Sequence, residues 1–315
     1  MKQQAIEQGL VAIEEMLISS VNSQIGVLKD ASEHILSSGG KRVRPRLALL
    51  AFLAAGGETI EDVIPMAAAV EMVHTATLVH DDINDHSLTR RGKATVHAKW
   101  GRTFALLTGD YLFTRGYELM APYGSTFNVI MADATTKLVE GETLQAAAAK
   151  AGEMDRETYK QVISLKTASL FEAASRMGAM LAEESDEVVD ALATYGYNLG
   201  LTFQIVDDIL DIVGDPEKLG KPTGTDLVQN RGVMMTQNGK GSSNGVETAV
   251  LEAVEEDDPS ASLMAALRDS GAVEVARMQA REMASRARTA LHKVAPSPAR
   301  DEMERMIDLV LERDR

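Results

Sequence analysis

Residues 60–85 read IEDVIPMAAAVEMVHTATLVHDDIND, an apolar stretch that ends in three aspartates. Its apolar residues recur at the spacing of a helix, which predicts a helix over 60–80. The closing Asp81-Asp82-x-x-Asp85 is repeated at Asp207-Asp208-x-x-Asp211, again after an apolar helical stretch. Residues four apart lie on one face of a helix, so each motif predicts a carboxylate pair with a third carboxylate beside it.

The neighbours of both motifs favour a binding site over a solvated acidic surface. A surface helix would carry polar flanks, but the residues before each motif are largely apolar. Close carboxylates repel one another and burial adds a desolvation cost, so such clusters become tolerable when cations lie between them. Mg²⁺ keeps several waters and takes one or two carboxylates together with substrate phosphates. We therefore predict magnesium as the cofactor, with these ligands: Asp81, Asp82, Asp85, Asp207, Asp208 and Asp211.

The composition of the 315-residue chain indicates a large all-α protein. Hydrophobic residues make up 45% and aromatic residues only 4%, and the abundant Ala, Leu, Met and Glu favour helices over sheets. The formal net charge of -15 argues against nucleic acid as a partner, because phosphate backbones require a basic surface. The chain has no cysteine, which excludes disulfides, thiolate chemistry and cysteine-bound zinc. With no signal-peptide pattern at its start, the protein is expected in the cytoplasm.

Helical periodicity extends along most of the chain. It covers 5–27, 44–53, 60–80, 103–120, 129–149, 156–181, 186–213 and 260–294, with breaks at paired glycines and at Pro122 to Gly124. Between 225 and 247 polar residues replace this pattern, which predicts a flexible polar loop within a single domain spanning 1–315. The longest apolar run, Leu47 to Ala55, is shorter than the ~20 residues that cross a bilayer, so no transmembrane segment is expected.

Two basic clusters accompany the acidic motifs, at residues 39–46 and 90–93. Arginine forks suit bidentate phosphate binding, lysine offers a point charge, and the glycines in both clusters let backbone amides approach an anion. Each cluster alone could be a solvated basic patch. Their closeness to the acidic motifs favours a phosphate-binding role.

One alternative metal chemistry follows from Glu71 and His74. They form a Glu-x-x-His pair, an element that helical di-iron carboxylate proteins carry twice. None of the other histidines has a glutamate three positions before it. The di-iron alternative is therefore discounted, and His74 by itself is typical of a satisfied core histidine.

A series of motifs between residues 35 and 226 resembles the trans-isoprenyl diphosphate synthases. The motifs are GGKRVRP from Gly39, HTATLVHDDIND from His74, RRG from Arg90, GDYLF from Gly109, GE from Gly141, KTA from Lys166 and FQIVDD from Phe203. The resemblance implies a homodimer whose helices surround a central active-site cavity. It also implies condensation of isopentenyl diphosphate with an allylic diphosphate, with about three Mg²⁺ ions per active site.

The same resemblance implies a role for each matched residue. The motif aspartates would carry the magnesium ions, and the allylic diphosphate would also be bound by Arg90, Lys166, Lys221 and Arg231. Isopentenyl diphosphate would be held by Lys41, Arg44, His74 and Arg91, with Phe203 close to its alkene. The catalytic residues would be Lys166, Thr167 and Gln204. Cations stabilise the charge of the leaving diphosphate, and a dry pocket protects the allylic cation until the released diphosphate takes the final proton.

The helix that leads into the first motif also predicts the length of the product. Counting back from Asp81, the residues Thr77, Ala76 and Val73 are expected to face down the cavity, and none is aromatic. One helical turn rises ~5.4 Å, comparable to an isoprene unit, so small residues leave room for further additions. The first motif also lacks the longer insert of many bacterial short-chain enzymes. We predict a trans-polyprenyl diphosphate of about six to ten units, with a short-chain product as the alternative.

The chain departs from the family pattern after residue 227. The family continues with glycine, lysine and a Thr-Leu-Pro run, whereas residues 230–235 here read NRGVMM. Arg231 preserves a cation, but arginine and lysine differ in shape and hydration. This departure leaves open a catalytic subunit that requires a separate partner.

Two other classes of protein are less compatible with the motifs. A terpene cyclase would carry an Asn or Asp, Ser or Thr, Glu pattern as its second motif, not a second Asp-Asp-x-x-Asp. A non-catalytic helical regulatory subunit is the non-enzyme alternative. Retention of both aspartate motifs and of the basic residues up to Lys221 argues against it.

Overall fold

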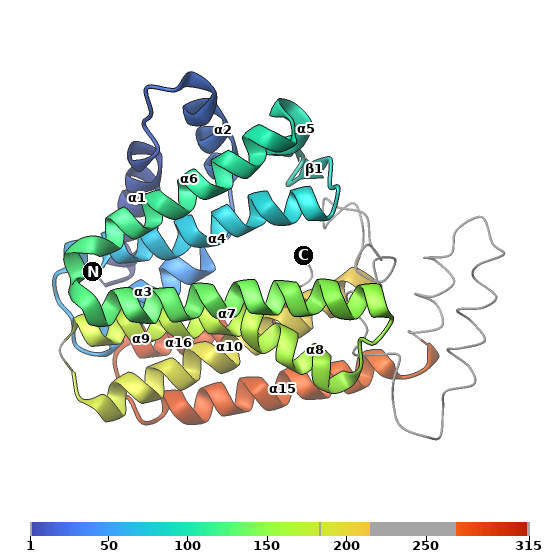
Figure 1. Cartoon of the computed structure of the whole chain (residues 1–315). Helices are drawn as coiled ribbons and strands as arrows, with labels where there is room; N and C mark the ends of the chain where they lie inside the picture. The colour runs from blue at the N-terminus through green and yellow to red at the C-terminus, as the bar shows by residue number, and fades with distance from the viewer. Residues whose placement is uncertain (1, 183, 215–268, 314–315) are drawn as a thin grey trace. The chain divides into compact units, whose positions relative to one another are not determined.

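The structure is a computed structural model that describes residues 2–182, 184–214 and 269–313, with side chains from residue 5 onward. The described chain is helical apart from one short hairpin (Figure 1). The predicted all-α fold is therefore confirmed. The predicted polar loop at 225–247 and the expected phosphate ligands Lys221 and Arg231 lie outside the described residues.

Up to α10, the elements follow one another with short connections. The helices are α1 (Lys2–Ser20), α2 (Gly26–Leu36), α3 (Val43–Ala54), α4 (Ile64–Asn84), α5 (Val96–Trp100), α6 (Arg102–Met120), α7 (Gly124–Ala151), α8 (Arg156–Ile163), α9 (Ser169–Leu181), α10 (Asp186–Val213), α15 (Ala272–Leu291) and α16 (Pro298–Leu311). Two 3-10 turns, η1 (Ile60–Asp62) and η2 (Ala121–Tyr123), and a π-helical segment, η3 (Ser164–Ala168), join some of them. Strand β1 (Thr89–Arg90) pairs antiparallel with β2 (Lys93–Ala94).

Several predicted helix ranges match, one is wrong, and one helix was not predicted. The range 186–213 coincides with α10, and 103–120 lies within one residue of α6. The single helix predicted over 5–27 is wrong, because α1 ends at Ser20 and α2 begins at Gly26. Between them the Ser23 hydroxyl accepts a hydrogen bond from the Ile25 amide at 3.1 Å, a local turn that competes with the helix. Periodicity also missed α16.

The chain forms two compact units that interleave along the sequence. Unit 1 comprises Met1–Thr135, Leu170–Ala193 and Leu291–Met303, and unit 2 comprises Thr136–Ser169, Thr194–Ala290 and Glu304–Arg315. The first aspartate motif belongs to unit 1 and the second to unit 2. The expectation of a single domain stays a prediction.

Helix α4 is the core helix of unit 1. It packs against α1, α3 and α6, and Figure 1 shows α4 and α6 side by side. Its buried residues lie on all sides, as expected for a helix inside a protein. Among the described residues, the stretch Ile60–Asn84 is the one that could cross a membrane by length and composition, and 78% of its most apolar window is buried within the structure. The first aspartate motif therefore stands at the end of a core helix.

The core of unit 2 brings α8, α10 and α15 together. Its buried cluster includes Tyr159 and Ile163 of α8, Ile205 and Ile209 of α10, and Ala276 of α15. The apolar side of α10 is thus fixed against two helices. The second aspartate motif occupies the last turns of this same helix.

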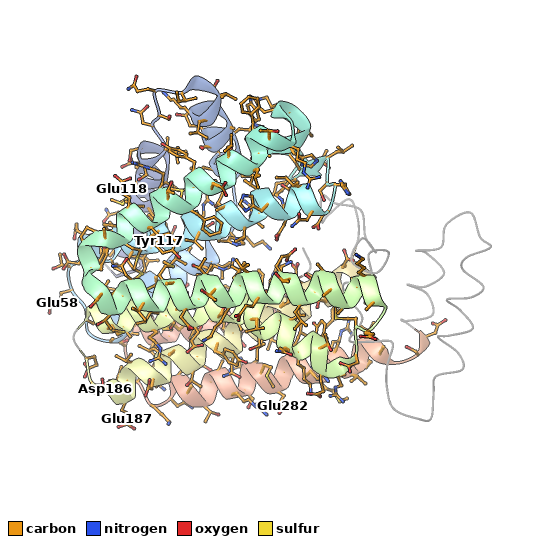
Figure 2. The ribbon with its side chains drawn as sticks, in the orientation of Figure 1. Glu58, Tyr117, Glu118, Asp186, Glu187 and Glu282 are labelled. Carbon is orange, nitrogen blue, oxygen red and sulfur yellow. The ribbon has the colours of Figure 1, made fainter. Side chains whose placement is uncertain are left out.

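Much of the negative charge of the protein lies on its surface. Figure 2 shows Glu58, Glu118, Asp186, Glu187 and Glu282 with their side chains turned away from the ribbon, and all five are exposed. Repulsion among such charges keeps a protein soluble and disfavours polyanions at the same surface. The cations near the two motifs are therefore the candidates for binding a phosphate.

Candidate functional site

The first aspartate motif lies at the C-terminal end of α4. Asp82 is only 1% exposed, and Arg90 Nε donates to both of its oxygens at 2.9 and 3.0 Å. Burial raises the pKa of Asp82, and the guanidinium of Arg90 opposes that shift. Asp85 caps the helix, where its amide donates to the Asp81 carbonyl at 2.8 Å. The motif thus holds one arginine already, on its most buried carboxylate.

Both aspartate motifs share an unfavourable position on their helices. The last carbonyls of a helix give its C-terminus a partial negative charge, so carboxylates there are destabilising and cations stabilising. Asp82 at the end of α4 pairs with Arg90, and Asp207 near the end of α10 pairs with Arg313 at 3.2 Å. Each motif therefore has an arginine bound to one of its carboxylates, which offsets the negative charge at these two helix ends.

The hairpin β1–β2 fixes the position of Arg91. The turn residues Arg91 and Gly92 have φ values of 50° and 74°, the left-handed pair that a tight two-residue hairpin turn requires. The Arg91 guanidinium donates to the Gly39 carbonyl. A Cβ on Gly40 would lie 2.7 Å from Arg91 Nη1, so glycine at this position makes room for the arginine. The two basic clusters predicted from the sequence are therefore brought together.

Arg42 has a structural role that the sequence did not indicate. Its side chain is buried and donates to Glu14, to Glu71 Oε1 at 2.8 Å and to the Leu36 carbonyl at 2.8 Å. Glu71 is itself only 3% exposed. Because its donors are used inside unit 1, Arg42 anchors the loop that carries Lys41 and the start of α3, where Arg44 lies. Local spacing could not have shown that Arg42 binds one glutamate on α1 and another on α4.

Arg44 and His74 lie next to this buried ion cluster. The guanidinium of Arg44 stacks over the Phe171 ring, 4.7 Å from its centroid, and burial lowers its pKa to about 10. Burial also lowers the pKa of His74 well below its usual value, and the positive charges of Arg44, Arg91 and Arg90 lower it further. His74 is therefore neutral beside several cations. Such a surplus of positive charge around a neutral donor favours an anionic ligand.

Lys41 completes the predicted set of unit 1 and is exposed. Unit 1 thus contains all of the residues that the sequence assigned to isopentenyl diphosphate except Phe203. Arg90, assigned to the allylic diphosphate, lies in the same unit against Asp82.

In unit 2, the second motif is tied into a hydrogen-bond network. Gln204 Nε2 donates to Asp208 Oδ1 at 2.8 Å, and the Thr167 hydroxyl donates to Gln204 Oε1 at 2.8 Å. The Tyr159 hydroxyl donates to the other oxygen of Asp208. The structure therefore connects Thr167, Gln204 and Asp208, as the sequence assignment of one site requires, and adds Tyr159, which the sequence analysis missed.

The remaining aspartates of this motif differ from Asp208. Asp207 pairs with Arg313, whose guanidinium also stacks 4.4 Å over the Phe203 ring. Asp211 is 1% exposed. Arg313 was not foreseen either, because it lies far from α10 in sequence.

A π-helical segment presents Lys166 and Thr167. In η3 the Ser169 amide bonds to the Ser164 carbonyl, one residue further back than in an α-helix. Lys166 Nζ donates to Gln145 Oε1 at 2.9 Å and pairs with Glu142, both on α7. A Cβ on Gly141 would lie 2.6 Å from the Lys166 amide nitrogen, so α7 approaches this segment closely only because residue 141 is glycine. Such π-segments occur frequently at functional sites.

The three residues predicted to set product length lie in the buried part of α4. Ala76 and Val73 are fully buried, whereas Thr77 keeps 7% exposure. Thr77 bonds through its hydroxyl to the His74 carbonyl at 2.7 Å, and Val73 faces Gly116 of α6. Their role in product length stays a prediction.

The donor chemistry of the two motifs fits a divalent cation that shares its ligands with a substrate. Among the described residues, no three His, Cys, Asp or Glu side chains converge to form a metal cage by themselves. Magnesium is usually bound by one or two carboxylates plus substrate phosphates and water, so it does not require such a cage. Carboxylates at two helix C-termini that already attract arginines supply suitable oxygen ligands.

Comparison with known proteins gives a consistent result. The polyprenyl synthetase family model matches residues 25–268. The chain is 34% identical over 313 residues to octaprenyl diphosphate synthase of Escherichia coli (strain K12), covering 98% of this chain and 97% of that protein. It is 36% identical over 302 residues to the short chain isoprenyl diphosphate synthase of Methanothermobacter thermautotrophicus, covering 90% of each.

A solved structure is also similar over nearly the whole chain. The polyprenyl synthase from Caulobacter crescentus CB15, complexed with calcium and isoprenyl diphosphate, superposes with a TM-score of 0.91 at 32% identity. The match covers 99% of this chain and 97% of that one.

Proposed function

The chain belongs to the polyprenyl synthetase family, and we propose that it joins isopentenyl diphosphate head-to-tail to an allylic diphosphate, giving a trans-polyprenyl diphosphate longer than about four isoprene units. The family assignment makes it a prenyltransferase, as the sequence motifs predicted. The observation that carries the proposal is the placement of an Asp-Asp-x-x-Asp motif at each of two helix C-termini, with an arginine on each.

Six aspartates are proposed to bind divalent cations, with Mg²⁺ as the ion used by the enzyme. They are Asp81, Asp82, Asp85, Asp207, Asp208 and Asp211. When bound, these cations stabilise the negative charge that develops on the departing diphosphate. Arg90 and Lys166, with Lys221 and Arg231 outside the described residues, are proposed to share that task.

The cationic cluster of unit 1 is proposed to hold isopentenyl diphosphate. Arg44 and Arg91 offer guanidinium forks and Lys41 a mobile point charge, which together suit a diphosphate. Neutral His74 donates a hydrogen bond without adding to the repulsion among the arginines. Glu71, held by Arg42, balances the buried positive charge when no anion is bound.

The residues of unit 2 are proposed to act at the reacting carbons. The carbon–oxygen bond of the allylic diphosphate breaks, the alkene carbon of isopentenyl diphosphate forms the new carbon–carbon bond, and the resulting cation loses a proton to the released diphosphate. Thr167 and Gln204 are bonded to each other, which fixes their relative orientation, and we propose that their oxygens face the reacting carbons. Phe203 supplies an aromatic face against the alkene.

The decisive experiment incubates the purified protein with Mg²⁺, isopentenyl diphosphate and allylic primers of different length. A condensed polyprenyl diphosphate is expected, with no product when Mg²⁺ is chelated. A hydrocarbon formed from the primer alone would indicate a cyclase instead. The proposal would be contradicted if no product formed and no diphosphate bound in an Mg²⁺-dependent manner.

A short-chain synthase is the second candidate, favoured by the 36% identity to the archaeal short-chain enzyme. The same incubation separates the candidates, because the products differ in length on chromatography. We further propose that the enzyme acts as a homodimer in the cytoplasm. Should the chain be inactive alone but active with a second subunit, the heteromer left open by the altered residues 230–235 would replace the homodimer.

A further inference from the structure

Tyr159 combines a core ring with a polar tip at the second aspartate motif. It lies in α8, is 2% exposed, and its ring belongs to the buried cluster of unit 2. A buried tyrosine hydroxyl requires a partner, because leaving it unbonded costs the desolvation of the group. Its hydroxyl donates to Asp208 Oδ2. A phenylalanine would fill the same space in the core, so packing alone does not require the hydroxyl.

The two oxygens of Asp208 are each held by a neutral donor. Tyr159 binds Oδ2, and Gln204, one turn earlier on the same face of α10, binds Oδ1 at 2.8 Å. The orientation of the Gln204 amide is fixed in turn by the Thr167 hydroxyl. The carboxylate plane of Asp208 is therefore set from two helices, α8 and α10.

These two hydrogen bonds orient the carboxylate through one donor on each oxygen. A carboxylate oxygen has two lone pairs, and each of these hydrogen bonds uses one of them. Neither of these two donors carries a charge, so neither of them neutralises the carboxylate, whereas Asp207 pairs with the guanidinium of Arg313. Groups that orient a metal-binding side chain in this way typically contribute about 10- to 100-fold to metal affinity or activity.

We propose that Tyr159 is a positioning residue: its hydroxyl holds Asp208 in the orientation that binds the divalent cation and diphosphate. The inference rests on the proposed function, since it requires that Asp208 binds the cation. Tyr159 touches neither substrate nor reacting atoms in this role. Its loss should therefore affect the cation requirement and leave the affinity for isopentenyl diphosphate unchanged.

Tyr159→Phe removes the hydroxyl and keeps the ring. The matched control is Tyr197→Phe, because Tyr197 lies on α10, packs against the same buried cluster and bonds through its hydroxyl to Ser164 Oγ at 2.8 Å, away from the aspartates. The unfolding temperature of each full-length protein is measured at rising Mg²⁺ with fixed inorganic diphosphate, and again without either. The KM for isopentenyl diphosphate is measured alongside.

We expect Tyr159→Phe to raise the half-saturating Mg²⁺ concentration by about 10-fold or more, with the KM for isopentenyl diphosphate unchanged. Tyr197→Phe should keep the wild-type Mg²⁺ requirement. Without ligands, the two variants should have similar unfolding temperatures. If the Mg²⁺ requirement is unchanged in Tyr159→Phe, or changes equally in both variants, the positioning role of Tyr159 is overturned while the proposed function still stands. A wild-type protein without any Mg²⁺-dependent shift would overturn the proposed function and the inference with it.

Discussion

Neighbouring arginines of one sequence motif have different physical roles. Arg42 is buried and bonded to two glutamates and a backbone carbonyl, whereas Arg44, two residues later, stacks on an aromatic ring beside neutral His74. The φ of 45° at Arg42 turns the chain just before α3, which separates the directions of the two side chains. The sequence motif indicates that cations are required here, but only the contacts tell which one anchors the loop.

Arg42→Met should destabilise the protein by about 3 kcal/mol or more, because it leaves buried Glu71 without its partner. The matched control is Arg46→Met, four residues later in α3. Arg46 pairs with exposed Glu7 at 2.8 Å, and breaking such a surface pair costs about 1 kcal/mol or less. Urea unfolding of both variants measures the difference. Equal losses would contradict the anchoring role of Arg42.

The lowered pKa of His74 predicts a dependence of stability on pH. In the unfolded chain a histidine takes up a proton near pH 6.5, whereas folded His74 resists protonation. Its contribution to stability is therefore fully present above the unfolded pKa and is lost as the pH falls below about 6.5. Between pH 7.5 and 5.5, the wild-type protein should lose about 1 kcal/mol more stability than His74→Gln. Parallel pH profiles of unfolding for the two proteins would show that His74 titrates normally.

At the scale of elements, both aspartate motifs lie at the C-terminal ends of helices. The sequence predicted the helical class, the core character of the helix before Asp81 and the pairing of an aspartate motif with each of two helices. It did not predict the hairpin that carries Arg91, because two-residue strands have no periodicity to detect. It also did not predict Tyr159 or Arg313, since their contacts with Asp208 and Asp207 join residues distant in sequence.

Gly141→Ala tests the close approach of α7 to the π-helical segment. The new Cβ would lie 2.6 Å from a backbone nitrogen, which cannot rotate away, so the helices must separate. We expect a loss of about 1–3 kcal/mol in unfolding free energy and a lower kcat, because Lys166 moves from its partners on α7. Gly26→Ala is the control, since a Cβ there meets nothing within 4 Å. Wild-type stability and turnover for Gly141→Ala would contradict the constraint.

Substitution on α4 tests the predicted control of product length. Thr77→Phe should shorten the polyprenyl product, because a ring at this position, which is 7% exposed, would block the growing chain. Ala76→Phe should shorten it as well, with a stability loss of about 1–3 kcal/mol from overpacking a fully buried position. Chromatography of the products measures both effects. Ala132→Phe, on the exposed side of α7, serves as a control, and an unchanged spectrum for the two α4 variants would refute the role of this helix.

At the scale of the whole molecule, an acidic protein concentrates its useful cations in two small regions. The net charge is -15, yet Arg44, Arg90 and Arg91 surround one histidine in unit 1. An acidic surface repels polyanions generally, whereas local cationic clusters of this kind suit the small diphosphate that we propose as their ligand. The overall charge was predictable from composition, but the local concentration depends on the hairpin and the loop at Gly39–Gly40.

Ligand-linked stability tests the joint action of both motifs. When Mg²⁺ and inorganic diphosphate are added together, the unfolding temperature should rise. At a hundredfold excess over the dissociation constant, the free energy of unfolding should increase by about 2.7 kcal/mol. Either component alone should have a much smaller effect. Asp81→Asn and Asp207→Asn should each abolish most of the shift, whereas exposed Asp30→Asn should preserve it. A full shift in either motif variant would show that the motif is dispensable for diphosphate binding.

The π-helical segment η3 shows where one extra residue can enter a helix without turning the rest of it. Its turn closes over five residues where an α-helical turn closes over four, so the additional residue is absorbed within Ser164–Ala168 and α9 keeps its direction. Phe171 thereby stays under the Arg44 guanidinium and the Ser175 hydroxyl on the Leu192 carbonyl. Loss of one codon in this segment should therefore leave the packing of α9 largely intact while displacing Lys166 and Thr167.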